Sequence, residues 1–251
     1  MYKKIYQYII KLINSFISLI YPYKCPICNK IILDKDTFCS DCWKKVKFIH
    51  KPFCNKCSAP FEFQVGEDDI CLNCINNKPL YIKLRSAVIY NKTISKLIFK
   101  FKFYDLTCLR YIMAKYMINA SYDIINDVDV LIPVPLHKRR LIYRKYNQSL
   151  LLANEIANKT DKIVINDFLI KIAHTTPQVK LRKKDRQNNL KNKFIVNPKY
   201  LNNIDKYKSY NFAIVDDVIT TGSTINECVK AFNNVDIYNI YVMTFAKTFL
   251  S

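Results

Sequence analysis

Residues Phe212–Thr224 read FAIVDDVITTGST, and this stretch carries the clearest signal for the fold of the chain. Its apolar lead, residues 212–215, has the length and branching of a strand that is buried on both faces. Residues 225–233 follow a helical pattern, and hydroxyl residues precede them where the N-cap of a helix belongs. A buried strand, a loop of small residues and a helix N-terminus together predict a binding site for an anion.

Two adjacent acids in this stretch, Asp216 and Asp217, narrow the choice of ligand. Two carboxylates repel a bare phosphate but suit hydroxyl groups or a metal ion, so we expect a sugar phosphate here. The alternative is an ordinary strand and turn before a capped helix. The use of glycine in this chain favours a ligand site. Glycine usually makes up about seven per cent of the residues of a protein. This chain has only two glycines, and Gly222 lies in the loop, where backbone must approach a ligand.

The stretch resembles the phosphoribosyl pyrophosphate (PRPP) fingerprint of type I phosphoribosyltransferases at each of its positions. That fingerprint has an apolar lead, two acids, an apolar pair and a loop of Thr, Gly and Ser. The chain contains no GxxxxGK[ST] sequence, which excludes a Walker loop.

The net charge of +20 has two interpretations. One is a nucleic-acid or membrane-surface partner. The other, which we favour slightly, is the coding bias of an AT-rich genome, because only seven of the 40 basic residues are arginine and Ile and Asn are abundant. Five of the arginines form two short runs, residues 139–144 and 182–186. Arginine makes bidentate contacts that lysine cannot reproduce, so these runs predict phosphate contacts.

Eight of the ten cysteines form four CxxC pairs within residues 25–74. The pairs are Cys25/Cys28, Cys39/Cys42, Cys54/Cys57 and Cys71/Cys74. Two such pairs supply four thiolates to a tetrahedral Zn²⁺, so pairing in sequence order predicts two zinc ribbons with two structural Zn²⁺ ions. Interleaved pairing and the loss of one metal are alternatives, and a disulfide scaffold is disfavoured because no secretion signal supports it. We expect the remaining thiols, Cys108 and Cys228, to be buried in the core.

Strand and helix patterns alternate through the rest of the chain, which predicts a doubly wound parallel sheet. We expect strands over residues 84–90, 128–134 and 237–245, strand-like runs within 163–173, helices over 94–103, 106–120 and 139–159, and a polar linker over 199–209. Basic residues crowd the end of the second strand, within residues 133–140, where α/β folds bind ligands. An anion there, near the first, would be a diphosphate. His137 is more typical of a loop histidine beside phosphate than of a catalytic residue.

Residues 1–22 have apolar side chains at helical spacing with polar interruptions. These interruptions argue against a transmembrane segment, and no cleavage site supports a signal peptide. We therefore expect an amphipathic helix that docks on the rest of the chain. Loose, peripheral contact with a membrane surface or a partner is the alternative.

The order of these features resembles the ComF family, which combines a double zinc ribbon with an amidophosphoribosyltransferase-like domain and is linked to competence and DNA uptake. The resemblance covers nearly the whole chain, including PVPLHKRR, RKYNQ and TPQVKLRKKDRQNNL. It implies a type I phosphoribosyltransferase-like α/β domain over residues 81–251, after a four-cysteine type of zinc ribbon module over 23–80. Two departures are visible. The family usually has glycine where this chain has Lys145, and again after the basic helix, where this chain has residues 103–105 (FYD).

The resemblance also implies roles for single residues. Asp216 and Asp217 would be the catalytic residues, which hold the ribose hydroxyls of PRPP, directly or beside Mg²⁺. The 5′-phosphate would lie on Thr220, Thr221, Gly222, Ser223 and Thr224. Pyrophosphate would lie on Val134, Pro135, Leu136, His137, Lys138, Arg139 and Arg140. The hood or substrate contacts would be Arg144, Asn147, Gln148, Gln178, Arg182, Arg186 and Asn189.

The implied activity is that of a cytoplasmic pentosyl-transferring glycosyltransferase, which would release pyrophosphate from PRPP in the presence of Mg²⁺. Nothing in the sequence specifies the acceptor. One alternative is a non-catalytic accessory protein that senses PRPP or a nucleotide and binds single-stranded DNA, since Tyr and Phe alternate with basic residues in 96–102 and 139–146. A zinc-dependent scaffold with a vestigial PRPP site is a weaker alternative.

Overall fold

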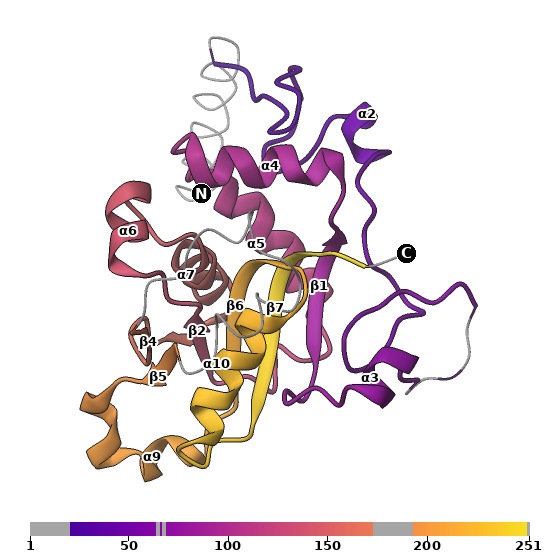
Figure 1. Cartoon of the computed structure of the whole chain (residues 1–251). Helices are drawn as coiled ribbons and strands as arrows, with labels where there is room; N and C mark the ends of the chain where they lie inside the picture. Colours follow the sequence, from indigo (N-terminus) through magenta and orange to yellow (C-terminus); the bar gives the residue numbers. More distant parts are fainter. Residues whose placement is uncertain (1–20, 64–65, 67–68, 173–192, 250–251) are drawn as a thin grey trace, which may run out of the picture. The chain divides into compact units, whose positions relative to one another are not determined.

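The computed structural model describes residues 21–63, 66, 69–172 and 193–249, apart from the side chain of Lys138 (Figure 1). The chain divides into two compact units, residues 1–46 and 47–251. The helix expected in residues 1–22 lies almost wholly outside the described residues. The described part contains no helix that is both long and apolar enough to cross a membrane. The boundary expected between residues 80 and 81 stays a prediction.

The first unit is built around the first cysteine quartet. Lys24 and Ile31 form an antiparallel bridge, and the N–H of Cys25 donates a hydrogen bond of 2.8 Å to the carbonyl of Lys30. Between them Asn29 has a φ of 64°, so the chain turns tightly after the first CxxC pair. In the second pair, Cys39 is the N-cap of the short helix α2 (Ser40–Trp43), and Cys42 lies within that helix.

A five-stranded sheet forms the centre of the second unit, and all of its strands are parallel. In spatial order they are β1 (Leu84–Ile89), β7 (Ile240–Lys247), β6 (Phe212–Ile219), β2 (Val130–Pro133) and β3 (Ile163–Val164). A separate antiparallel pair consists of β4 (Leu169–Lys171) and β5 (Phe194–Val196). The expected parallel α/β fold is confirmed.

Helices cover both faces of this sheet (Figure 1). On one face α5 (Leu109–Ala120) packs on β1 and β7, while α7 (Gln148–Thr160) packs on β2 and β6; α4 (Lys92–Phe103) packs beside α5. On the other face α10 (Ser223–Asn233) packs with β6 and β5. α10 is amphipathic because Ile225, Cys228, Val229 and Phe232 recur at helical spacing, and all four are buried.

The crossovers on the two sides of the sheet run in opposite directions. β2 continues through α7 to β3, whereas β6 continues through α10 to β7. β2 and β6 are neighbours, so the direction of the crossovers reverses between them. Open α/β sheets bind ligands at such a switch point, outside the carboxyl ends of the strands. The topology thus places the candidate site where β2 and β6 end.

Two expected segments differ from the structure. The helix expected over residues 139–159 is two helices, α6 (Lys138–Arg144) and α7, because Lys145 between them is left-handed with φ 64°. The expected polar linker over 199–209 contains the 3₁₀ helix η2 (Pro198–Asn203) and the short helix α9 (Asp205–Lys208). Asn197 caps the first of these by accepting a hydrogen bond from the N–H of Lys199, and Pro198 occupies its first position.

Two smaller expectations were also wrong. The N-cap of α10 is Gly222, which is left-handed with φ 76°, and no side-chain cap is formed there. Cys108 is exposed at the N-cap of α5, while Cys228 is fully buried as expected.

The second cysteine quartet is attached to the edge of the sheet. Its segment includes α3 (Leu72–Asn76). The Ser58 hydroxyl donates a hydrogen bond of 2.6 Å to the carbonyl of Leu84 in β1, and Nζ of Lys247 in β7 donates one of 2.6 Å to the carbonyl of Cys57. Arg85 of β1 is 1% exposed and donates from its two terminal nitrogens to the carbonyl of Asn55 and to Asp123. These contacts make the second ribbon part of the second unit.

Candidate functional site

The two acids lie where β6 extends beyond its neighbour β2. β2 pairs with β6 only as far as Val215, because the chain leaves the sheet after Val134. β6 continues to pair with β7 up to Ile219. Asp216 and Asp217 are therefore inside the strand, whereas the sequence pattern had suggested that they lie at its end. The strand fixes both side chains, and the paired part of β2 ends before it reaches them.

The two carboxylates have different partners. The Ser149 hydroxyl at the start of α7 donates a hydrogen bond of 2.9 Å to Oδ1 of Asp216, which also accepts from the N–H of Asp217 at 2.9 Å. Oδ2 of Asp217 lies 2.5 Å from Nζ of Lys102, at the end of α4. This contact is an ion pair rather than an aligned hydrogen bond. Residues from α4 and α7 thus hold the two acids from separate directions.

Asp216 ionises unusually for an aspartate. Burial raises its pKa, and the charge of Asp217 raises it further, to about 7. Lys102 and the Ser149 hydroxyl oppose the shift but do not cancel it. Near neutral pH the Asp216 carboxyl is therefore partly protonated, and it can donate as well as accept a hydrogen bond.

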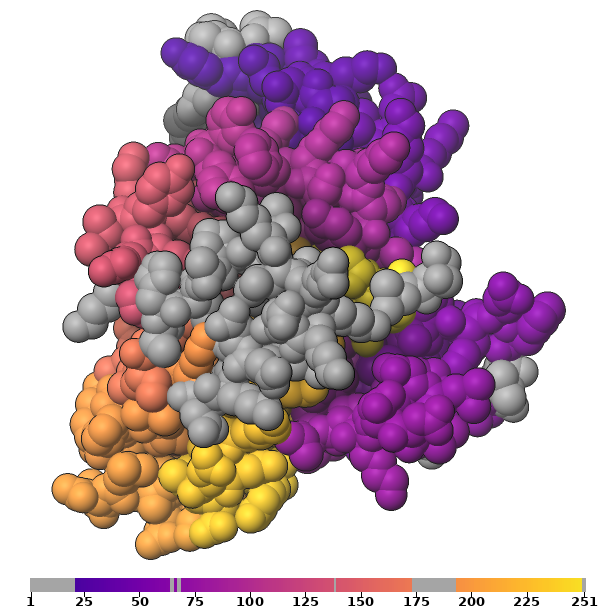
Figure 2. All heavy atoms as spheres, viewed as in Figure 1, coloured from indigo at the N-terminus to yellow at the C-terminus, as the bar shows by residue number. Residues whose placement is uncertain are grey.

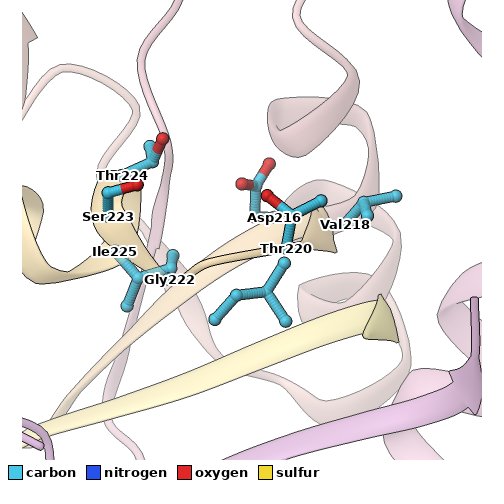
Figure 3. A pocket seen from close by; sticks show the side chains of 8 residues that line it. Asp216, Val218, Thr220, Gly222, Ser223, Thr224 and Ile225 are labelled. Carbon is cyan, nitrogen blue, oxygen red and sulfur yellow. The ribbon is translucent and has the colours of Figure 1, made fainter. Parts of the chain in front are cut away.

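The loop after β6 forms the wall of an open hollow beside Asp216. Figure 3 shows Asp216 and Thr220 near the end of β6, and Ser223 and Thr224 across from them at the start of α10. The hollow measures about 250 Å³, part of which is open solvent. Gly222 makes the turn with its positive φ, and the Thr221 and Ser223 hydroxyls lie 2.6 Å apart. The first N–H groups of α10 have no helical partner and are available to an anion here.

The segment expected to hold pyrophosphate follows β2 directly. Val134 is buried, and Asn147 donates a hydrogen bond of 3.0 Å to its carbonyl. His137 caps α6, since its Nδ1 accepts a hydrogen bond of 3.3 Å from the N–H of Arg139. The Arg139 side chain is exposed, whereas Arg140 is half-buried and burial lowers its pKa. Pro135 and Leu136 are half-buried in the same segment.

The residues expected to contact the substrate from the start of α7 have structural contacts. Asn147 caps α7 through the N–H of Ser149. Gln148 is 2% exposed and accepts a hydrogen bond of 3.3 Å from Arg144, while its Nε2 atom lacks a partner among the described residues. The other four expected residues lie outside the described residues: Gln178, Arg182, Arg186 and Asn189.

Three residues at this site were not predicted from the sequence: Lys102, Ser149 and Lys171. Lys102 lies in the stretch 96–102, which the sequence links only to contact with single-stranded DNA. Ser149 belongs to no sequence motif that indicates a function. Lys171 of β4 is charged in a partly buried setting. Burial lowers its pKa to about 8, and the nearby charge of Arg140 acts in the same direction. Their proximity to Asp216 depends on contacts between elements far apart in the chain.

The eight clustered cysteines form two quartets, paired in sequence order. Within each quartet the Sγ atoms all lie within 4.8 Å of one another. Cys28 and Cys39 are 3.5 Å apart at sulfur, and Cys57 and Cys71 are 3.7 Å apart. Tetrahedral Zn²⁺ with Zn–S bonds of about 2.3 Å requires sulfur atoms roughly 3.8 Å apart. All ten cysteines are free thiols, so the geometry fits two zinc ions and excludes both interleaved pairing and a disulfide scaffold.

Two thiols are already poised for metal binding. The neighbouring Cys57 thiol and the N–H of Cys71 lower the pKa of Cys54 to about 4, although burial opposes them. Burial raises the pKa of Cys25, but backbone hydrogen bonds from the following turn and from Cys39 outweigh it and lower the pKa to about 7. Thiolates are the form that binds zinc.

Similarity to known proteins decides the family. Competence protein F of Haemophilus influenzae is 30% identical over 231 residues, which span 90% of this chain and 97% of the relative. The chain belongs to the ComF family. Residues 16–75 match the double zinc ribbon domain, in agreement with the two quartets. Both parts of the expected resemblance, family and zinc ribbon, are confirmed.

Enterobacterial relatives of this ComF chain are more distant. The DNA utilization protein YhgH of Salmonella typhi is 26% identical over 216 residues, covering 83% of this chain and 90% of the relative. YhgH of Escherichia coli K12 is 24% identical over 211 residues, covering 82% of each chain. Competence and DNA utilization are thus the processes named for the proteins that this ComF chain resembles.

Proposed function

We propose that this ComF protein binds PRPP at the end of β6 and transfers its phosphoribosyl group to an acceptor during DNA uptake in the cytoplasm. The observation that carries the proposal is the placement of Asp216 beside the Thr220–Thr224 turn, with Asp217 next to it in β6, at the switch point of a doubly wound sheet. Carboxylates suit ribose hydroxyls and a helix N-terminus suits the 5′-phosphate. The zinc ribbons have a structural role in this proposal.

The second half of the ligand has a matching surface. PRPP carries a diphosphate on the ribose carbon that reacts. Arg139 and Arg140 follow β2, the strand next to β6, and Lys171 is electrostatically coupled to Arg140. Cations at this end of the sheet would neutralise a diphosphate as it leaves. Arg140 and Lys171 are both partly buried, which strengthens their interaction with an anion.

The chemistry expected at the site is substitution at the ribose carbon through a cationic, oxocarbenium-like state. The negative charge of Asp217 would favour that cation, and Asp216 would bind a hydroxyl group in either protonation state. Mg²⁺ keeps most of its ligands from water and substrate phosphates, so it would enter with the diphosphate and add charge there. Among the described residues, the cysteine quartets alone unite three or more metal-ligating side chains, so protein groups would complete rather than build a Mg²⁺ site.

Binding and turnover can be measured separately. Isothermal titration of the zinc-loaded chain with PRPP and Mg²⁺ should give one site per chain, and Asp217→Asn should weaken it. Release of pyrophosphate should then be followed with candidate acceptors, namely bases, amines, ammonia and water. Absence of PRPP binding would refute the proposal. Tight binding without pyrophosphate release from any acceptor would instead favour the non-catalytic alternative.

That alternative has one specific observation in its favour. Exposed aromatic side chains and the half-buried Arg144 lie at the ends of α4 and α6, two elements that reach the same face in Figure 2. Rings of Phe99 and Phe103 lie 4.9 Å apart, and Arg144 lies over the Phe103 ring at 5.2 Å. Tyr104 and Tyr143 are 64% and 78% exposed. Exposed rings and cations of this kind stack on the bases of single-stranded nucleic acid.

A salt titration tests this second function. Binding of a labelled single-stranded oligonucleotide, followed by fluorescence anisotropy, should weaken steeply as salt rises. Phe103→Ala should weaken it by about tenfold, since stacking contributes roughly 1–3 kcal/mol per base. Phe63→Ala is a matched control, because Phe63 is also exposed but belongs to the second cysteine segment. Equal loss in both variants, or no salt dependence, would contradict a stacking surface on α4.

A further inference from the structure

Among the described residues, Lys102 is the one basic side chain that forms an ion pair with Asp216 or Asp217. Its Nζ atom lies 2.5 Å from Asp217, and the exposed fractions of the two side chains are 22% and 7%. At this depth solvent screens the pair only weakly. Lys102 lies in the last turn of α4, where the helix dipole favours a cation.

The end of α4 is fixed in place, so the lysine is directed at the site. The Tyr146 hydroxyl donates a hydrogen bond of 2.7 Å to the carbonyl of Phe101, the residue before Lys102. Phe101 is fully buried, and its ring lies 6.4 Å from that of Tyr146. A little further along the chain, Ser149 holds Asp216. Residues just before and at the start of α7 therefore position the lysine and the first acid together.

The ion pair reduces the net negative charge of a site that would otherwise repel an anionic ligand. Asp216 lines the hollow beside the phosphate cradle, and Asp217 is buried next to it in β6, so two negative charges there would disfavour an anion. Lys102 balances the charge of Asp217, and Asp216 is partly protonated near neutral pH. The ribose end of the site is therefore close to neutral without any divalent cation.

Resting on the proposed function, we infer that Lys102 is the positioning residue of the ribose subsite. It holds Asp217 in place through the ion pair and supplies the positive charge that a divalent cation would otherwise supply there. The ligand class follows from this. A ribose 5-phosphate group should bind this subsite without a divalent metal, so that any Mg²⁺ requirement comes from the diphosphate alone.

Ribose 5-phosphate is the probe, because it lacks the diphosphate. Calorimetric titration of the zinc-loaded chain, in buffer freed of divalent metals before the protein is added, should show binding. Added Mg²⁺ should change the wild-type affinity less than threefold. Lys102→Met should weaken binding by about tenfold or more, as expected for loss of a charged contact. Added Mg²⁺ should restore part of that loss, and Lys102→Arg should retain binding.

Lys96→Met is the matched control, since Lys96 lies on the same helix but is exposed. It should leave the affinity unchanged. A cycle with Asp217→Asn separates positioning from a general structural effect. If Lys102 acts through Asp217, Lys102→Met should have little effect in the Asp217→Asn background. The double variant also avoids a buried unpaired carboxylate, so it keeps the test available if Lys102→Met alone fails to fold.

The outcomes are distinct. Wild-type affinity in Lys102→Met, equal losses in both backgrounds, or a wild-type chain that needs Mg²⁺ for ribose 5-phosphate would each overturn the role of Lys102 while leaving PRPP binding intact. A wild-type chain that binds neither ribose 5-phosphate nor PRPP, with or without Mg²⁺, would instead refute the proposed function.

Discussion

The Nζ atom of Lys145 lies 2.9 Å from Oδ2 of Asp105, and both residues have left-handed backbone, with φ of 64° and 53°. Lys145 stands where the ComF resemblance led us to expect glycine, and Asp105 belongs to the segment 103–105, the other place where glycine was expected. A left-handed residue other than glycine costs about 1–2 kcal/mol. The ion pair is 74% and 56% exposed, and exposed pairs contribute only about 0–1 kcal/mol. The backbone cost therefore outweighs the ion pair.

Lys145→Gly should accordingly raise the free energy of unfolding, by up to about 1 kcal/mol. Lys145→Ala is the matched control, because it removes the ion pair and keeps the unfavourable φ. Urea unfolding followed by circular dichroism measures both. If Lys145→Gly proves less stable than Lys145→Ala, the backbone at this turn is not what limits stability.

The raised pKa of Asp216 predicts how stability depends on pH. Its pKa is 3.8 for an ordinary aspartate and about 7 here, so between these values the folded chain binds more protons than the unfolded chain. Stability contributed by Asp216 therefore falls as pH rises from about 4 to about 7. Asp216→Asn removes this fall. Its stability relative to the wild type should increase with pH across the window and level off above it.

Unfolding in urea should be compared for the two proteins at intervals from about pH 5 to about pH 8, with zinc present. The charged or titratable groups that act on Asp216 are Asp217, Lys102, Lys171 and Cys228. Lys171 titrates near pH 8, and burial raises the pKa of the Cys228 thiol, so both change charge above the window. A stability difference that is constant with pH would contradict a raised pKa of Asp216.

Gly222 should not tolerate a side chain. Its φ of 76° strains any other residue, although a Cβ atom there would meet nothing closer than 3.7 Å. Gly222→Ala should therefore cost about 1–2 kcal/mol of stability through the backbone alone, and it should weaken PRPP binding by shifting the turn. Gly66→Ala, at the other glycine of the chain, is the control and should leave PRPP binding unchanged. Equal PRPP affinities in both variants would argue against the turn as a phosphate cradle.

The two zinc ions should differ in what they stabilise. The quartet of Cys25 lies in the first compact unit, and that of Cys54 lies in the second, tied to β1 and β7. Cys25→Ser and Cys54→Ser should each reduce zinc from about two ions per chain to about one. Only Cys54→Ser should lower the melting temperature of the sheet, measured by far-ultraviolet circular dichroism. Equal melting temperatures would show that the second ribbon does not support the sheet.

Local patterns were sufficient for the sheet and the zinc quartets. The run of apolar residues in β6 and the spacing of the CxxC pairs each report a structure formed by residues close in the sequence. The same reasoning missed the break at Lys145, because lysine gives no sign of a left-handed turn that depends on its surroundings. It also ended β6 too early, since two acids look like a loop until pairing with β7 holds them in the sheet.

The contacts that define the candidate site were beyond such patterns. Lys102 and Asp217 lie far apart in the sequence, and Lys171 comes near Asp216 only through folding. Alternating charge along α4 does not reveal which lysine points inward. The hydrogen bond from Tyr146 to the carbonyl of Phe101 fixes the end of α4, and Lys102 pairs with Asp217 from there.

The decisive measurement is a structure of the zinc-loaded chain in complex with PRPP and Mg²⁺. We expect the 5′-phosphate on the backbone of the Thr220–Thr224 turn, the ribose hydroxyls at Asp216 and Asp217, and the diphosphate toward Arg140. PRPP bound elsewhere on the chain, or a β6 site that stays empty at saturating PRPP, would contradict it.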